Sequence, residues 1–313
     1  MREPDPAEEV VIAFGFDDQY APHAAAAVAS IAANAPGARL HFLIVHDGVP
    51  EARQLEFATA APEARFSWLQ IDEAHLPDYI VRADTPHIRR ATLFRLQLDC
   101  LAPASVRRVL YLDSDLVVLG DVRRIWCAEL DGAPIGAVAD AAVADPRIVI
   151  DQFASAYGLA HNALGYFNAG ALLMDLERIR SEGGFRDALK FLIERNPRLA
   201  DQDALNWLFW GRWRKLDPMW NVQAASVVNV HQSEAANANA GGPALVHFTG
   251  DNKPWQASAY HPWAWLYWRY LARTPFLLEV MRDHHASLAG LARAWLRYQR
   301  RRPRAPEVRH GAL

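Results

Sequence analysis

Short apolar, β-branched runs alternate with helical stretches over the first 71 residues, and this order limits the fold more than any other feature. Strands are expected at 10–14, 40–45 and 65–71, with helices between them at 20–34 and 50–60. Because β-α-β units are joined by right-handed crossovers, these strands are expected to be parallel neighbours in one sheet. The chain is therefore predicted to be an α/β protein.

Further apolar and helical stretches follow along the chain. Strands are expected at 109–112, 134–139, 167–174 and 244–248, and helices at 91–100, 201–210 and, rich in Trp, Tyr and Arg, across 263–300. We expect one nucleotide-binding catalytic domain at residues 1–258 and a helical, basic C-terminal extension at 259–313.

Composition excludes several classes of protein. Of 313 residues, 51% are hydrophobic and 22% charged, which is typical of a globular chain and not of a disordered one. The formal net charge of −3 argues against a nucleic-acid partner. No apolar run of about 18 residues is present, the N-terminus lacks a signal-peptide pattern, and two cysteines form no disulfide framework. We therefore expect a cytoplasmic protein.

The sequence Asp113-Ser114-Asp115 follows directly after the predicted strand at 109–112. Ligands of open α/β sheets bind at the carboxyl ends of strands, and two carboxylates spaced i, i+2 can face one cation. The alternative is a solvated turn, since Asp and Ser are common turn residues. The apolar runs on both sides favour a metal site inside the fold, suited to Mn²⁺ or Mg²⁺.

A second group of chemically active residues lies between His247 and Trp255. A neutral imidazole from His247 could complete a metal site, and Lys253 could hold phosphate oxygens, with Gly250 allowing a tight loop. Taken alone, this stretch is better described as a partly buried histidine and a surface lysine.

Three more segments carry polar residues where the pattern needs explanation. Asp201-Gln202-Asp203 opens a helix; one acid can be an N-cap, whereas Gln202 could face a sugar. Asn168-Ala169-Gly170 lies within a predicted strand, where Asn and Gly are depleted and Gly often marks close approach of a ligand. Asp17-Asp18 follows the first strand, and no Walker or G-x-G-x-x-G sequence is present.

Five blocks of sequence, taken together and in their order along the chain, resemble the glycosyltransferase family 8 enzymes. This family includes bacterial lipopolysaccharide galactosyl- and glucosyltransferases and glycogenin. The resemblance covers about residues 10 to 256. The blocks are Phe14–Tyr20, Ala91–Leu96, Leu110–Asp115, Tyr166–Gly170 with Asp201–Asp203, and His247–Trp255.

The resemblance implies a GT-A fold, with a mixed central sheet flanked by helices, and a role for each matching residue. The implied metal ligands are Asp113, Asp115 and His247. The implied donor-binding residues are Phe14, Gly15, Asp17, Gln19, Arg95, Asp113, Ser114, Asn168, Ala169, Asp201, Gly250 and Lys253. Gln202, beneath the anomeric carbon, and Asp201 are implied catalytic residues, and Asp140 falls on the acceptor side. Where this chain has Gln19, the bacterial galactosyltransferases carry Asn. The contact with uracil that the resemblance implies at this position would therefore be made by a longer side chain.

The implied reaction is transfer of galactose or glucose from a UDP-sugar to a glycan or lipid-linked acceptor, with the anomeric configuration retained. Gln202 is a poor nucleophile because an amide is neutral, so a same-face attack with Gln202 stabilising an oxocarbenium-like transition state is favoured. The alternatives are a sugar-nucleotide-binding pseudoenzyme and a nucleotidyltransferase. The acidic loop after the first strand argues against the latter.

The C-terminal tail is the most basic part of the chain. Between residues 293 and 313 there are seven arginines and one glutamate, interspersed with aromatic side chains. A basic, aromatic helix is typical of a protein that binds anionic membrane surfaces, and the alternative is a solvated tail. We expect a peripheral membrane contact through residues 288–304, on the inner face of the membrane.

Overall fold

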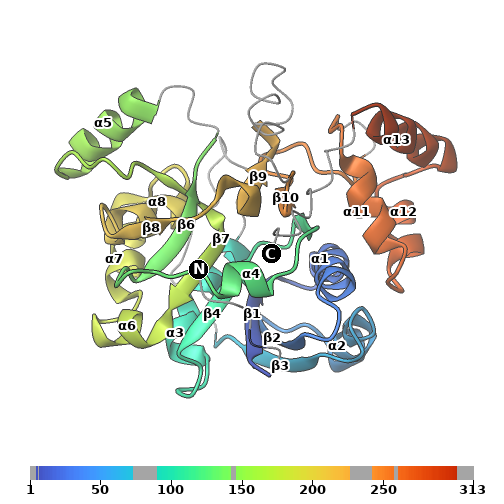
Figure 1. Ribbon diagram of the computed structural model, residues 1–313, viewed down its shortest axis with the longest axis horizontal. Coiled ribbons are helices and arrows are strands. Elements are labelled where there is room, and N and C mark those ends of the chain that lie inside the picture. The colour runs from blue at the N-terminus through green and yellow to red at the C-terminus, as the bar shows by residue number, and fades with distance from the viewer. Residues whose placement is uncertain are drawn as a thin grey trace, which may run out of the picture.

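The computed structural model describes residues 5, 7–72, 90–141, 146–225, 242–256 and 260–301. Within these ranges, a mixed sheet lies at the centre and helices flank it (Figure 1). No helix in the described part of the chain is both long enough and apolar enough to cross a membrane.

The central sheet has seven strands in the order β3-β2-β1-β4-β7-β6-β8 (Figure 1). They are β1 (Glu9–Gly15), β2 (Arg39–His46), β3 (Arg65–Gln70), β4 (Arg108–Leu112), β6 (Ile135–Ala139), β7 (Phe167–Asp175) and β8 (Trp213–Lys215). The first four in chain order pair in parallel, as predicted, whereas β7 runs antiparallel to both β4 and β6. The predicted mixed sheet is thus confirmed.

Helices occupy the connections between these strands. They are α1 (Ala21–Asn34), α2 (Glu51–Ala58), α3 (Leu98–Leu101), α4 (Arg123–Trp126), α5 (Pro146–Tyr157), α6 (Leu176–Ser181), α7 (Arg186–Arg195) and α8 (Ala200–Leu208), with 3₁₀ helices η2 (Arg90–Gln97) and η3 (Pro218–Asn221). Alanine makes α1 both strongly helical and thin, so nearly its whole length is buried. Pro22 suits its first turn, and the chain leaves the helix through Gly37, whose φ is +71°.

The helix expected at 91–100 is only partly an α-helix. Residues 90–97 form η2, and a single α turn, α3, follows. In a 3₁₀ helix, residues i and i+3 lie one above the other, so Thr92 and Arg95 face the same way. Both contact Asp201 of α8, and this shared partner accounts for the tighter helix.

A second, small sheet was not predicted. It contains β5 (Leu116–Val118), β9 (Val222–Gln223) and β10 (Leu245–His247) in the order β5-β10-β9. Strand β5 begins only four residues after β4 ends, so Asp113, Ser114 and Asp115 connect the two sheets. The small sheet therefore brings β10 next to this connection.

The predicted C-terminal helices are α11 (Ala264–Leu271), α12 (Leu277–Asp283) and α13 (Leu288–Arg301). Helix α11 packs on α1, where the Asn34 amide donates a hydrogen bond to the Tyr270 hydroxyl at 2.8 Å. Buried aromatic side chains of α11 join the same hydrophobic core as the central sheet. The predicted domain boundary after residue 258 lies outside the described residues and stays a prediction.

Candidate functional site

Two carboxylates and one imidazole meet where the two sheets are connected. One ligand atom from each of Asp113, Asp115 and His247 lies within 4.8 Å of the other two. The backbone fixes all three: the Asp113 N–H donates to the Gly170 carbonyl at 2.9 Å, the Phe248 N–H donates to the Asp115 carbonyl at 2.9 Å, and β10 pairs His247 with Leu116.

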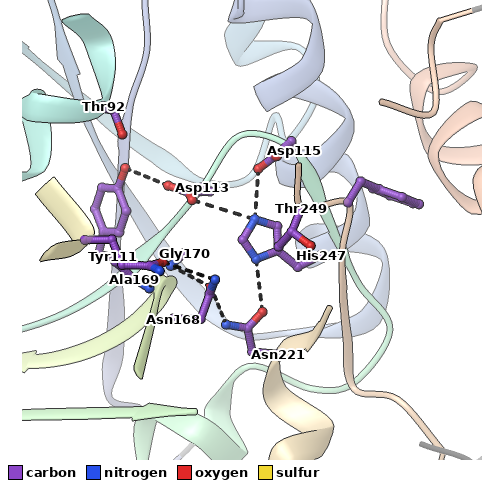
Figure 2. Close-up of polar contacts among 12 residues, drawn as sticks. Thr92, Tyr111, Asp113, Asp115, Asn168, Ala169, Gly170, Asn221, His247 and Thr249 are labelled. Carbon is purple, nitrogen blue, oxygen red and sulfur yellow. Dashed lines mark hydrogen bonds and ion pairs between the residues drawn. The ribbon is translucent and has the colours of Figure 1, made fainter. Parts of the chain in front are cut away.

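A chain of hydrogen bonds determines which nitrogen of His247 carries the proton (Figure 2). The Gly170 N–H can only donate, so the side-chain atom of Asn168 that it meets at 3.0 Å is the oxygen. The Asn221 amide nitrogen donates to that same oxygen at 2.9 Å, which leaves the Asn221 oxygen facing His247 Nδ1 at 3.0 Å. Nδ1 therefore carries the proton in the neutral imidazole.

The other nitrogen of His247 then presents a lone pair to the acids. Nε2 lies 3.2 Å from Asp115 Oδ1 and 3.7 Å from Asp113 Oδ2. Acceptor atoms that face one another at these distances need a positive charge between them, either a proton on Nε2 or a metal ion. Two carboxylate oxygens and an imidazole nitrogen are ligands that suit Mn²⁺, so the residues present fit a divalent metal.

Gly170 is required by the crowding around this cluster. A Cβ atom at position 170 would lie 2.1 Å from His247 Cε1 and 2.7 Å from Asp113 Oδ2. Gly170, the glycine noted within a predicted strand, therefore marks a close approach of two side chains.

Lys253 is buried beside Asp115. Its Nζ forms an ion pair with Asp115 Oδ2 and donates to the Phe248 carbonyl at 2.9 Å. Burial alone would raise the pKa of Asp115, but Lys253 and His247 outweigh it and hold that pKa well below its usual range. Burial would lower the pKa of Lys253, and Asp115 reverses this, so both groups are charged at neutral pH.

Arg95 joins Asp113 to Asp201. Its guanidinium lies 2.7 Å from Asp113 Oδ1 and 2.9 Å from Asp201 Oδ2, and it donates to the Ala169 carbonyl at 2.6 Å. Burial raises the pKa of Asp201 to about 6, an effect that Arg95 opposes and Asp113 reinforces. Tyr111 lies under the guanidinium, 4.5 Å from ring centroid to Cζ, and its hydroxyl donates to Asp113 Oδ1 at 3.1 Å.

Gln202, Asn168 and Asp140 form a network of amides around one carboxylate. Asp140 Oδ2 accepts from Gln202 Nε2 at 2.9 Å and from Asn168 Nδ2 at 3.1 Å. The carbonyl oxygen of Gln202 accepts from the Ala169 N–H at 3.0 Å and from Asn168 Nδ2 at 3.2 Å. The expectation that one of these acids is the N-cap of α8 is wrong, because the N-cap is Leu199. Asp203 lies in the first turn of the helix and accepts from the Leu199 N–H at 2.8 Å.

The remaining predicted donor residues differ in exposure. Asp17 accepts from the Tyr20 N–H at 2.9 Å, and Gln19 is exposed. Phe14 is fully buried in the core, so only its backbone could face a donor. Gly15 packs against η2, and Gly250 is exposed with a φ of +78°. Ser114 is buried, and its Oγ has no hydrogen-bond partner within the described ranges.

Four residues of the cluster were not predicted: Thr92, Tyr111, Asn206 and Asn221. Asn206 bonds both the N–H and the carbonyl of Phe167 at 2.9 Å, which ties α8 to β7. Tyr111 could have been found, since it precedes Asp113 by two residues and so shares its face of the strand. Nothing in the sequence around Asn221 indicates its contact with His247.

The chain is similar to several known proteins. The model of the family described as glycosyl transferase family 8 matches residues 11–259. General stress protein A of Bacillus subtilis (strain 168) is 28% identical over 274 residues, 82% of this chain and 91% of that protein. Lipopolysaccharide 1,2-glucosyltransferase of Escherichia coli (strain K12) is 25% identical over 285 residues, 87% of this chain and 80% of that protein.

A solved structure shares the whole architecture. The crystal structure of the galactosyltransferase LgtC in complex with donor and acceptor sugar analogues superposes with a TM-score of 0.72 at 25% identity, covering 88% of this chain and 100% of that one. The predicted GT-A fold is therefore confirmed. Because the family model matches most of its length, this chain belongs to glycosyl transferase family 8 and is a glycosyltransferase.

Proposed function

We propose that this glycosyltransferase moves galactose or glucose from a UDP-sugar to a glycan or lipid-linked acceptor, with retention of configuration and with Mn²⁺ or Mg²⁺. The observation that carries this proposal is the lone pair of His247 Nε2, fixed toward Asp115 and Asp113 beside the buried cation of Lys253. The donor and acceptor analogues bound to LgtC, and the 1,2-glucosyltransferase activity named for the E. coli relative, support this substrate class.

Asp113, Asp115 and His247 would hold the metal, which would supply positive charge to stabilise the departing diphosphate. Lys253 would add a second positive charge on the same side of the site. Arg95, fixed between Asp113 and Asp201, would bind donor oxygens with any N–H that the two acids leave available. Asp17, Gln19 and the backbone of Phe14 and Gly15 would bind the nucleoside.

Retention is proposed to follow from a same-face attack. Both lone pairs of the Gln202 carbonyl oxygen accept hydrogen bonds, from the Ala169 N–H and from Asn168 Nδ2, so this oxygen is a poor nucleophile. Its partial negative charge is held in place and can stabilise an oxocarbenium-like transition state. A glycosyl adduct on Gln202 or Asp201, detected by mass spectrometry, would contradict this mechanism.

The donor proposal is tested by thermal shift with UDP, UDP-glucose, UDP-galactose, GDP-mannose and NAD, each with and without Mn²⁺. A ligand at about a hundred times its Kd adds about 2.7 kcal/mol to the free energy of unfolding, enough to raise Tm by several degrees. We expect a shift only with UDP compounds plus Mn²⁺. A shift without sugar transfer would favour a pseudoenzyme. No Mn²⁺-dependent shift with any UDP compound would contradict the donor proposal and favour the pseudoenzyme and nucleotidyltransferase alternatives.

A peripheral membrane contact through α13 is also proposed. Leu288, Trp295 and Leu296 are 77%, 43% and 47% exposed on this basic helix, whereas Ala294 is buried against the core. Apolar side chains flanked by arginines suit a surface of anionic lipid. Residues 302–304 of the predicted segment lie outside the described residues.

Sedimentation with vesicles of phosphatidylserine and phosphatidylcholine at low salt tests this contact. The double substitution of Trp295→Ser with Leu296→Ser should reduce binding, whereas Leu278→Ser on α12, which removes an even more exposed leucine, should not. Equal binding by all three proteins, or by a chain ending at Ala286, would contradict the proposal.

A further inference from the structure

The loop that carries Lys253 is anchored by side chains from outside it. Trp255 stacks on His23 of α1, with ring centroids 3.6 Å apart and planes 9° apart. Both residues are buried, at 3% and 4% exposure. A stack of this kind fixes the chain two residues beyond Lys253 against α1.

Helix α11 completes the anchor. The Tyr267 hydroxyl lies 2.7 Å from His23 Nδ1, and Trp268 Nε1–H donates to the Pro254 carbonyl at 3.0 Å. Burial raises the pKa of Tyr267, so its hydroxyl stays neutral and available for this hydrogen bond. We refer to His23, Trp255, Tyr267 and Trp268 as the aromatic clamp.

Trp255 of the clamp and Lys253 belong to one short segment of the chain. The Gln256 N–H donates to the Lys253 carbonyl at 3.0 Å, which closes a turn over Pro254 and Trp255. At the other end, Lys253 Nζ contacts Asp115 and the Phe248 carbonyl. The exposed Gly250 between Phe248 and Lys253 has open space around it, so the clamp determines where this side of the loop lies.

We infer that His23, Tyr267 and Trp268 are positioning residues, which hold Lys253 where it can bind the diphosphate of the donor. Helix α11, which lies beyond the predicted nucleotide-binding domain, thereby contributes to donor affinity without touching the donor. This inference rests on the proposed function, in which Lys253 binds donor phosphate oxygens.

The same helix offers a matched pair of substitutions. Tyr267 and Tyr270 are both buried on α11, and each hydroxyl bonds a side chain of α1: His23 for Tyr267, and Asn34 for Tyr270. Of these two tyrosines, only Tyr267 belongs to the aromatic clamp. Tyr267→Phe and Tyr270→Phe should therefore lower Tm by similar amounts, while only Tyr267→Phe changes donor binding.

The experiment measures the Kd of UDP with Mn²⁺ by titration calorimetry on the full chain, in the native and Lys253→Met backgrounds. We expect Tyr267→Phe to raise Kd about fivefold in the native background, the loss of roughly one hydrogen bond. It should leave Kd unchanged once Lys253 is methionine, because the clamp acts through that residue. Tyr270→Phe should leave Kd unchanged in both backgrounds, and the acceptor KM should not respond to either substitution.

Two results would overturn the inference. Equal effects of Tyr267→Phe and Tyr270→Phe would show a general loss of stability, and an effect of Tyr267→Phe that persists in Lys253→Met would show a route that bypasses the lysine. If Lys253→Met itself leaves the Kd of UDP unchanged, the proposed role of Lys253 fails first and the inference fails with it.

Discussion

The two halves of the candidate site are held together by different forces. The charged half (Arg95, Asp113, Asp115, His247 and Lys253) consists of ionised groups and one imidazole, paired at short range. The amide half (Asn168, Gln202 and Asn221) is neutral, and the direction of its hydrogen bonds is set by the backbone N–H groups of Gly170 and Ala169. Charges exchange partners when an ion arrives, whereas a satisfied amide network keeps its shape. Under the proposed function, donor binding would therefore change the charged half and leave the amide half as it is.

The ion pair of Asp115 with Lys253 shows how such an exchange works. The pKa of Asp115 is held well below its usual range, so this carboxylate is ionised at neutral pH and a metal ion would compete with Lys253 for it. A cation bound to Asp115 would free Lys253 Nζ for an anionic phosphate.

Asp115→Asn would break the charged half and should have the largest effect. It removes a carboxylate from the metal cluster and leaves Lys253 charged and buried without its partner, which costs about 3–5 kcal/mol of stability. Glycosyl transfer is expected to fall about a thousandfold. The control is Asp121→Asn, whose ion pair with Arg123 is more exposed and is worth under about 1 kcal/mol. Transfer rates within tenfold of each other in the two variants would refute the assignment.

Gln202→Ala would break the amide half while sparing the charged half. It removes the acceptor of the Ala169 N–H and the donor to Asp140. We expect kcat to fall about a hundredfold, which corresponds to roughly two to three hydrogen bonds, with the Kd of UDP and Mn²⁺ unchanged. Separate measurements of kcat and Kd check this, and an equal loss in both would mean that the two halves do not act separately.

Gly170→Ala tests the contact between the halves. The added Cβ would clash with His247 and Asp113, yet residue 170 keeps the N–H that orients Asn168. Mn²⁺ affinity should fall about 10- to 100-fold, as when residues that orient metal ligands are changed. Gly290→Ala on α13, where a Cβ meets nothing closer than 3.4 Å, serves as the control. Unaltered Mn²⁺ binding in Gly170→Ala would exclude His247 and Asp113 as ligands.

The smallest expected effect is on the stability of the fold at acidic pH, and it arises from the buried residue His261. His261 packs its ring edge on Phe248, and burial lowers its pKa from 6.5 to about 3. The unfolded chain therefore binds a proton that the folded chain does not, so this contribution to stability is lost as pH falls from 6.5 toward 3, by up to roughly 1.4 kcal/mol per pH unit. Unfolding by urea at pH 7 and pH 5 should show a smaller loss of stability in His261→Phe than in the native chain. An identical loss would contradict the buried, neutral state of His261.

The sequence predicts the charged half better than the rest of the site. The acids at 113 and 115 follow an apolar strand, and strand ends meet at one edge of a sheet, so their placement follows from local pattern. The small sheet escaped prediction because β5 has three residues and pairs with β10 more than a hundred residues later. Asn221 is similarly out of reach, since its partner Asn168 is 53 positions away. Residues 91–100 were predicted as one helix, and the 3₁₀ form of residues 90–97 could not be foreseen because it depends on contacts with α8.

The short connection between the two sheets has a consequence for unfolding. Asp113 is bonded to the large sheet through Gly170, Asp115 is bonded to the small sheet through Phe248, and only Ser114 separates them. A ligand that binds both carboxylates would cross-link the two sheets at this point. Its binding free energy would then oppose separate opening of either sheet, so that regions able to unfold independently would unfold as one cooperative unit.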